Sequence, residues 1–237
     1  IAPDLRGHGD SEWMLGGSYN QIDYVYDIAQ LLQQKQMSRV TVIGHSLGGS
    51  ISLLYTALHP DRVNKLVAIE GMGPPPSMIK ERMDQTMSER LHGWMNDVRK
   101  SSGRLVKRYP SLEEAFQRMQ TENPHLSEAQ ARHLTIHGSN QNEDGTFSWK
   151  FDNYVRNFSP IGIPLSDMAK LYGDITCPTL LVRGLESWAS DPIADGRTKS
   201  FNCPLEVEAF ADAGHWVHHD QLDGFVERVK TFLNAPA

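Results

Sequence analysis

The sequence predicts an α/β fold, with a mostly parallel sheet and helices on both of its faces. Short apolar segments rich in β-branched residues alternate with amphipathic segments of helical period, as expected for strands joined by crossover helices. A long polar segment of helical character interrupts this alternation once, which predicts an inserted helical domain. The chain has 237 residues, of which 39% are hydrophobic and 22% are charged, so it can bury a sizeable core.

The first part of the chain predicts helices and strands in alternation. Its expected elements are a loop over 16–19, a helix over 19–37, a strand over 39–44, a helix from beside Ser46 to before Pro60, and a strand over 63–71. The segment 39–44 is a short, mainly apolar and β-branched run, typical of a parallel strand buried on both faces, and 63–71 is expected to be another buried strand. The alternation therefore favours right-handed crossovers within one sheet.

The rhythm changes after the Pro-rich segment 73–77. The sequence from 78 to about 167 is polar and helical, with a turn expected over 140–145 and a short alternating strand over 146–152. We therefore expect an inserted helical cap, or lid. The expected domains are an α/β core formed by residues 1–72 and 168–237, and a cap formed by residues 73–167.

The α/β pattern returns in the last part of the chain. Apolar runs predict strands over 179–184 and 205–210. A helix is expected near 192–200, where Pro192 suits the first turn, and an amphipathic helix over 222–233. These two strands are expected to complete the sheet, with the two helices packed against it.

Charge and composition exclude some classes of function. The net charge of −6, from 23 basic and 29 acidic residues, disfavours a nucleic-acid partner. No apolar run approaches the roughly 18 residues that a transmembrane helix needs. Cys177 and Cys203 are expected to be free thiols, typical of a reducing compartment, so we expect a cytoplasmic protein. The pattern predicts no oligomeric state.

The segment VIGHSLGG, residues 42–49, contains the pentapeptide G-x-S-x-G centred on Ser46. Between a predicted strand and a predicted helix, this pattern is typical of a nucleophile elbow. The sharp turn would expose the Ser46 hydroxyl and direct the backbone N–H of Leu47 toward a developing oxyanion. The alternative is that Ser46 only caps the helix.

A serine nucleophile needs a base, and the segment ADAGHWVHHD, residues 211–220, follows the last predicted strand. His215 comes directly after a glycine in this loop, so it is the expected base. His218 and His219 are expected to be loop or surface residues. A metal site built from the three histidines lacks a matching carboxylate or cysteine pattern. We therefore expect no metal and no organic cofactor.

Five segments together resemble the α/β-hydrolase superfamily, in the lidded branch that includes serine hydrolase-like proteins and many bacterial esterases. They are APDLRGHGDS, VTVIGHSLGGSISLLYTALHPDRV, LVAIEGMGPPP, TLLVRGLESWASDP and ADAGHWVHHD, in the family's order. The resemblance implies the α/β-hydrolase fold with an inserted helical cap. It also implies that the family's first three strands, and a His-Gly loop supplying the second oxyanion donor, precede Ile1.

The resemblance leaves the third triad residue open. Many relatives carry an aspartate after the strand LLVRG, but Trp188 occupies that position here. Glu70, at the end of the strand that follows the elbow, is the favoured acid, because some relatives keep their acid there. Asp191 and Glu186 are the alternative acids. Glu70 could instead fix its own loop, and Asp191 could cap a helix before Pro192.

The expected function is that of a serine hydrolase cleaving carboxylic esters through an acyl-enzyme intermediate, with a small-molecule ester or other acyl compound as substrate. The expected substrate pocket includes His45, Met72, Trp188 and Trp216. A C–C bond hydrolase, a thioesterase or an acyltransferase would use the same triad. A non-catalytic binding homologue, or an inactive fragment, is the alternative from another class. A dehalogenase or epoxide hydrolase of this superfamily would have an aspartate in place of Ser46.

Overall fold

The computed structural model describes residues 1–14, 19–157 and 159–236. Residues 16–18 of the loop expected at 16–19 lie outside them. The chain forms two compact units: unit 1 comprises Ile1–Asn20 and Met87–Pro160, and unit 2 comprises Gln21–Thr86 and Ile161–Ala237. The expected domain boundaries at residues 73 and 168 stay a prediction.

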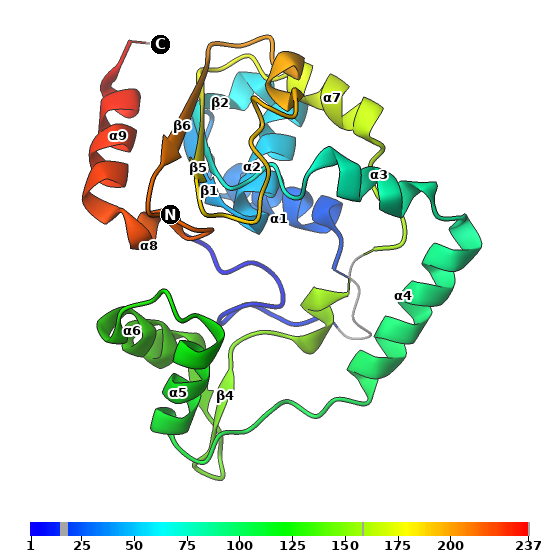
Figure 1. Cartoon of the computed structure of the whole chain (residues 1–237), viewed down its shortest axis with the longest axis vertical. Helices are drawn as coiled ribbons and strands as arrows, with labels where there is room; N and C mark the ends of the chain where they lie inside the picture. Colours follow the sequence, from blue (N-terminus) through cyan, green and yellow to red (C-terminus); the bar gives the residue numbers. More distant parts are fainter. Residues whose placement is uncertain (15–18, 158, 237) are drawn as a thin grey trace. The chain divides into compact units, whose positions relative to one another are not determined.

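Within the described residues, four parallel strands form the sheet of unit 2, in the order β1-β2-β5-β6 (Figure 1). They are β1 (Val40–His45), β2 (Val63–Ile69), β5 (Thr179–Gly184) and β6 (Leu205–Phe210). Each of the four strands expected for the sheet is therefore present. The expected burial of the first strand on both faces is wrong, because β1 lies at an edge of the sheet that the described residues form, and its Thr41 and Ile43 are exposed. The register is parallel throughout, for example His45 opposite Ile69 and Ile69 opposite Val182. All four carboxyl ends consequently meet at one edge.

Helices cover both faces of this sheet. On one face α2 (Leu47–Leu58) packs against β1 and β2, and α1 (Gln21–Gln34) and α7 (Leu165–Gly173) pack against α2. On the other face, α8 (Val217–Asp220) and α9 (Leu222–Asn234) cover the sheet and pack against side chains of β2 and β5 that point to that face (Figure 1). The predicted fold class, a mostly parallel α/β sheet with helices on both faces, is confirmed.

The packing of α9 explains how the sequence stabilises the second face. Val67 and Ile69 of β2 alternate with side chains that face α2, and they contact Val229 and Phe232 of α9. Burying each such side chain contributes about 1.5–3 kcal/mol. The buried ammonium of Lys65 donates to the carbonyls of Phe232 and Leu233, at 2.9 Å each, and so satisfies the end of the helix.

The polar segment between β2 and β5 is mainly helical. It contains α3 (Pro76–Asp84) in unit 2, and in unit 1 the elements α4 (Met87–Ser102), α5 (Leu112–Glu122), α6 (Glu128–Gly138), β3 (Ser139–Gln141), β4 (Phe147–Trp149) and the 3₁₀ helix η2 (Asn153–Arg156). The start of α6 is a capping box of Ser127 and Gln130.

Two local expectations differ from the structure. The turn expected over 140–145 is shorter, because residues 140 and 141 pair with β4 in an antiparallel hairpin and only 142–145 form the turn. The helix expected over 192–200 is absent from the described chain: a turn is followed by the 3₁₀ helix η3 (Arg197–Ser200). Gly196, with φ of 84°, leaves the helical conformation and ends any continuous helix there.

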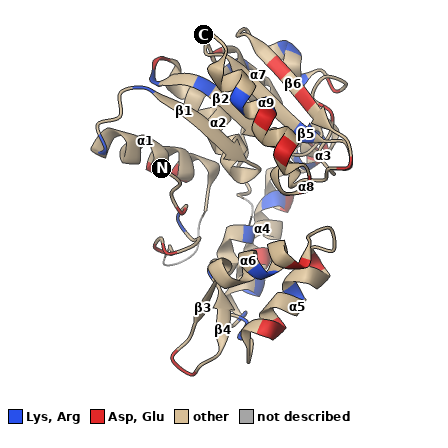
Figure 2. Ribbon diagram, turned by 90° about the vertical axis from the view of Figure 1, so that its left-hand side faces the viewer, with Lys and Arg blue, Asp and Glu red and all other residues tan. Residues whose placement is uncertain are grey.

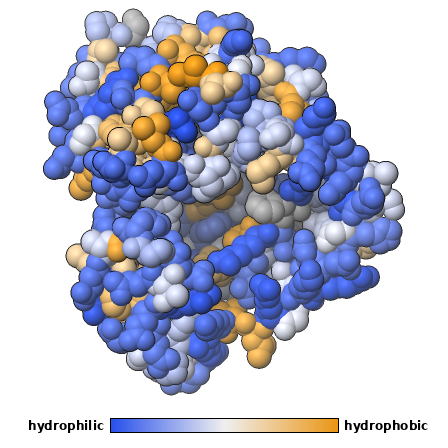
Figure 3. Space-filling view, viewed as in Figure 1, coloured by the Kyte–Doolittle hydropathy of each residue, from blue (hydrophilic) through white to orange (hydrophobic). Residues whose placement is uncertain are grey.

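The surface carries mixed charges. Figure 2 shows basic and acidic residues interspersed along the ribbon, and Figure 3 shows hydrophilic residues over most of one face. None of the helices within the described residues combines the length and hydropathy of a bilayer-crossing segment. Cys177 and Cys203 are free thiols.

Candidate active site

The carboxyl ends of the strands in unit 2 bring the predicted triad residues together. Ser46 follows β1, Glu70 follows β2, and His215 lies in the loop after β6. His45 and Ile69 are opposite each other in the register, so Ser46 and Glu70 leave their strands at the same level. In open parallel sheets this edge is where ligands usually bind.

Ser46 occupies a sharp turn between β1 and α2. Its backbone has φ of 53° and ψ of −114°, a conformation that a non-glycine residue rarely adopts, and its N–H donates to the Ile69 carbonyl at 2.8 Å. A Cβ atom on Gly44 would lie 2.3 Å from the Gly48 carbonyl oxygen. The glycine spacing therefore permits the close approach that the turn requires.

The backbone N–H of Leu47 lies at the start of α2. As the first residue of the helix, Leu47 has an N–H without an acceptor in the preceding turn, and the helix dipole makes this end attractive to negative charge. The position fits the expected oxyanion donor, whose role stays a prediction.

The ring of His215 lies between Ser46 and Glu70. Its Nε2 is 2.8 Å from Ser46 Oγ, and its Nδ1 is 3.2 Å from Glu70 Oε2. Since an ionised carboxylate only accepts hydrogen bonds, the contacts fit a neutral ring that carries its proton on Nδ1 and accepts the Ser46 proton at Nε2. The Gly214 N–H donates to Asp220 Oδ2 at 2.8 Å and fixes the loop before His215.

Glu70 is held at both carboxylate oxygens. Its Oε1 accepts the Gly184 N–H at 2.8 Å, and its Oε2 accepts the Ser187 hydroxyl at 2.6 Å in addition to facing His215. The side chain is fully buried, and the backbone has a positive φ of 52°. A residue in this strained conformation is held there by its surroundings, which is common at functional sites.

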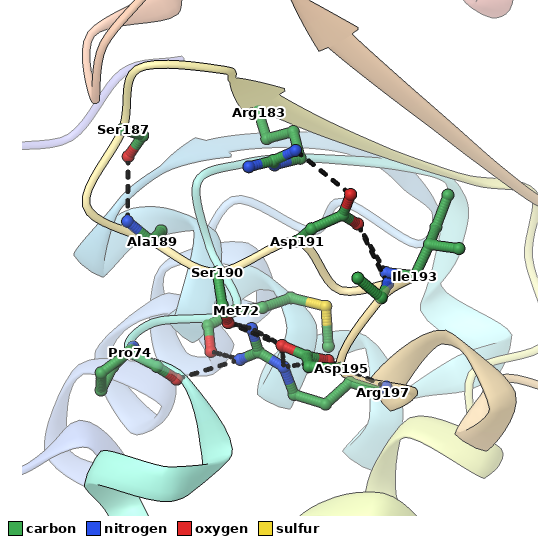
Figure 4. A network of polar contacts seen from close by, with 11 residues as sticks. Met72, Pro74, Arg183, Ser187, Ala189, Ser190, Asp191, Ile193, Asp195 and Arg197 are labelled. Carbon is green, nitrogen blue, oxygen red and sulfur yellow. Dashed lines mark hydrogen bonds and ion pairs between the residues drawn. The ribbon is translucent and has the colours of Figure 1, made fainter.

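The two alternative acids have other environments. Asp191 lies 3.3 Å from the Arg183 guanidinium, and its other oxygen accepts the Ile193 N–H at 2.8 Å, as Figure 4 shows. Glu186 is exposed, and its backbone N–H donates to the Ala213 carbonyl. The carboxylate that the structure places beside His215 is that of Glu70.

The expected pocket residues lie at different positions around the triad. Trp188 is 60% exposed, and its ring centroid lies 5.1 Å from that of His215. His45 Nε2 donates to the His215 carbonyl oxygen at 2.7 Å, which requires the Nε2–H tautomer. Met72 lines a cavity of about 20 Å³ beside Glu70, and Trp216 contacts His219. Their roles in binding a substrate stay predictions.

Two further histidines near the triad are shielded from solvent. Burial lowers the pKa of His45, and burial with the nearby His45, His219 and His215 rings lowers the pKa of His218 to about 4. Both rings are therefore neutral near pH 7 and add no positive charge beside His215. Within the described residues, no group of three or more His, Cys, Asp or Glu side chains is arranged to hold a metal ion.

Sequence reasoning did not identify the residues that support Glu70. Ser187 contacts its carboxylate, and Arg197 joins the segments after β2 and β5 through the Met72 and Pro74 carbonyls, Ser190 and Asp195 (Figure 4). The available signal was position: β2 and β5 are neighbours, so polar residues after both strands meet.

Comparisons with known proteins identify the family of this chain. The family model described as the alpha/beta hydrolase fold matches residues 1–222. An esterase of Mycobacterium tuberculosis, Rv0045c, is 26% identical over 246 residues, which cover 99% of this chain and 74% of the relative. The 2-(acetamidomethylene)succinate hydrolase of Mesorhizobium japonicum is 27% identical over 238 residues, covering 99% of this chain and 78% of that protein.

A solved structure shows the same fold. The thioesterase domain from the curacin biosynthetic pathway superposes with a TM-score of 0.78 at 22% identity, over 96% of this chain and 79% of that chain. The family match spans most of the sequence, and the strand-end geometry is that of a hydrolase elbow. The chain therefore belongs to the α/β-hydrolase family.

Proposed function

We propose that this chain is a serine hydrolase that cleaves carboxylic esters of small molecules through an acyl-enzyme intermediate. One observation carries the proposal: a continuous series of contacts runs from Glu70 Oε2 to His215 Nδ1 and from His215 Nε2 to Ser46 Oγ, at 3.2 and 2.8 Å. The name of the mycobacterial relative, an esterase, supports ester bonds as the first class of substrate to test.

In the acylation step, His215 Nε2 accepts the hydroxyl proton as Ser46 Oγ forms a bond to the carbonyl carbon of the ester. The negative charge moves to the carbonyl oxygen, where the Leu47 N–H is placed to stabilise it. His215 then protonates the leaving alcohol oxygen as the ester C–O bond breaks, which leaves the acyl group on Ser46.

Glu70 supports both half-reactions. Its buried carboxylate accepts from Nδ1, keeps the ring in one tautomer and stabilises the imidazolium that forms when Nε2 takes a proton. In deacylation, His215 removes a proton from water as the water oxygen attacks the acyl carbon. The proton returns to Ser46 Oγ, and the carboxylic acid leaves.

The experiment combines a fluorophosphonate probe with hydrolysis of p-nitrophenyl esters. We expect one covalent adduct on Ser46. Ser46→Ala should lose the adduct and lower kcat by about 10⁴-fold or more. Glu70→Gln should lower kcat by about 10³–10⁴-fold, because the amide cannot accept from Nδ1 in the same way.

Asp191→Asn is the matched control, because it neutralises a carboxylate on the neighbouring loop that contacts Arg183 instead of His215. It should change kcat by less than about threefold. A larger loss in Asp191→Asn than in Glu70→Gln would overturn the assignment of the acid. An unlabelled Ser46 in the wild-type protein would favour a binding role without catalysis.

Different substrates separate the reactions that a triad of this kind can catalyse. Thioesters, β-diketones and ester substrates with an added alcohol test thioesterase, C–C bond hydrolase and acyltransferase activity in turn. We expect the highest kcat/KM for hydrolysis of simple carboxylic esters. A higher value with any other class would correct the proposed substrate and leave the proposed triad unchanged.

A further inference from the structure

We infer that Ser187 is a positioning residue for the Glu70 carboxylate. Its hydroxyl holds the carboxylate in the orientation that faces His215 and, by donating a hydrogen bond to Oε2, partly neutralises the negative charge on that oxygen. This inference rests on the triad proposed above and adds a fourth residue to it. Ser187 lies in the segment after β5, whose usual acid position in related sequences is occupied here by Trp188.

The direction of the hydrogen bond follows from its partners. Ser187 Oγ is 2.6 Å from Glu70 Oε2, and it also accepts the Ala189 N–H at 3.2 Å (Figure 4 shows the contact with Ala189). A backbone N–H can only donate, and a carboxylate can only accept. The single proton of the hydroxyl is therefore directed at Oε2, and Ala189 fixes the hydroxyl from the other side.

The two oxygens of Glu70 have different tasks. The Gly184 N–H occupies Oε1, whereas Ser187 and His215 share Oε2. The last side-chain torsion of glutamate has a broad energy profile, so one contact at Oε1 does not fix the plane of the carboxylate. The Ser187 hydroxyl supplies the second fixed point and sets the lone pair that Nδ1 of His215 meets.

Sharing Oε2 also affects the charge that His215 experiences. The bond from Ser187, at 2.6 Å, is short, whereas the contact to His215 Nδ1 is longer, at 3.2 Å. The hydroxyl therefore competes with His215 for the negative charge on Oε2. Without Ser187, the carboxylate is less well oriented, but it stabilises a positive charge on His215 more strongly.

The other titratable groups around His215 leave Glu70 as the ionised neighbour. His45 contacts it from the end of β1, His218 of α8 lies close enough to interact with it electrostatically, and His219 packs against His218. Burial lowers the pKa of both His45 and His218, so these two rings are neutral in the working range of a serine hydrolase. A change at Ser187 is therefore expected to reach His215 through Glu70.

The segment that carries Ser187 is itself anchored. Arg197 donates to Ser190 Oγ at 2.8 Å and to the Met72 carbonyl in the segment after Glu70. Its guanidinium pairs with Asp195 at 2.8 Å, and the two side chains are only 11% and 16% exposed. Ser187 and Glu70 thus lie on two segments that hydrogen bonds from the Arg197 guanidinium to the Met72 and Pro74 carbonyls join (Figure 4).

The test compares Ser187→Ala with Ser187→Thr, which keeps the hydroxyl, and with Ser190→Ala. Ser190 is the matched control, since it lies on the same segment and donates to Asp195 instead of Glu70. We expect Ser187→Ala to lower kcat about tenfold, as for a lost hydrogen bond to a charged group, with KM unchanged. The acid limb of its kcat/KM profile should move to higher pH, and the Nδ1 proton resonance of His215 should shift in the NMR spectrum.

Ser187→Thr should restore the wild-type pH profile and resonance. Ser190→Ala should change neither, even if it lowers Tm. The inference is overturned if Ser187→Ala leaves the acid limb and the Nδ1 resonance at their wild-type positions, or if Ser190→Ala shifts them equally. The NMR readout needs no turnover, so this outcome is distinct from failure of the proposed function, in which wild-type Ser46 would neither react with the fluorophosphonate nor hydrolyse esters.

Discussion

The turn between β1 and α2 and the segment after β5 both present functional groups at the same sheet edge, but they are held by different forces. The turn around Ser46 relies on backbone packing, because Gly49 lies so close to Gly71 that a Cβ atom would be 2.6 Å from the Gly71 Cα. The segment after β5 is irregular and relies on side-chain hydrogen bonds and ion pairs, centred on Arg197. Local geometry therefore fixes the turn of Ser46, the proposed nucleophile, and long-range polar contacts fix the surroundings of Glu70, the proposed acid.

This difference has a consequence for substitutions. A turn held by close backbone approach should respond to a single added methyl group, whether or not charges change. A loop held by ion pairs should respond to loss of one charge, and should recover when both charges are removed. The two regions should also respond to different pH ranges, because neutral histidines lie beside the turn and a carboxylate lies within the loop.

Gly44→Ala should have the largest effect on stability. The added Cβ would lie 2.3 Å from the Gly48 carbonyl oxygen, so the backbone of the turn must move, at a cost of about 3 kcal/mol or more. Urea denaturation measures the change. Gly48→Ala is the matched control: its Cβ would meet no atom within 4 Å, so it should be neutral or stabilise α2 by up to about 1 kcal/mol. Equal losses in both variants would contradict backbone packing as the cause.

Arg197→Met should have the second-largest effect, a decrease of about 2–3 kcal/mol in the free energy of unfolding. Burial by itself would raise the pKa of Asp195, but hydrogen bonds from Arg197 and Ser190 outweigh it and lower this pKa. Without Arg197, the carboxylate is left partly buried and unpaired.

A double-mutant cycle with Asp195→Leu tests this explanation. The double variant should be more stable than Arg197→Met, because it removes the unpaired charge. If the two losses simply add, the ion pair does not hold the segment. Because the pKa of Asp195 is lowered, the pair's stabilisation in the wild-type protein should persist above the ordinary aspartate range near 4 and disappear as the pH falls below it.

His218→Phe should have the smallest effect, confined to acidic pH. The folded protein keeps His218 neutral down to about pH 4, whereas the unfolded chain protonates it near pH 6.5. The unfolded state therefore binds more protons between these values, and wild-type stability falls as the pH is lowered through this window. Partial exposure of the ring limits this contribution to about 1 kcal/mol.

In the His218→Phe variant, the slope of unfolding free energy against pH should be shallower between pH 6.5 and 4. The wild-type slope will not vanish in the variant, because burial also lowers the pKa of His45. Denaturation curves at pH 5 and pH 8 check the change. If the free energy of unfolding changes by the same amount between pH 8 and pH 5 in the wild-type protein and in the variant, the lowered pKa of His218 is contradicted.

The strands were the most predictable part of the fold. Short, mainly apolar segments with several β-branched residues, such as 63–69, favour strands, and the structure has a strand in each. The segment 192–200 was predicted as a helix from Pro192 and its spacing, but side-chain contacts of Asp191 and Asp195 and the left-handed Gly196 hold it in turns. Such polar residues compete with the helix by bonding to nearby N–H groups.

The sequence alone determined the turn that presents Ser46 and the loop that carries His215, because these features depend on short-range steric rules at glycines and on position after a strand. It left Glu70, Asp191 and Glu186 as candidate acids, because Trp188 occupies the position where the resemblance predicts an aspartate. In the tertiary structure, Glu70 is the one of these three candidates whose carboxylate lies beside His215. The positive φ of Glu70, its burial and its contacts with Gly184 and Ser187 depend on residues more than a hundred positions away in the sequence, and these contacts direct its carboxylate toward His215.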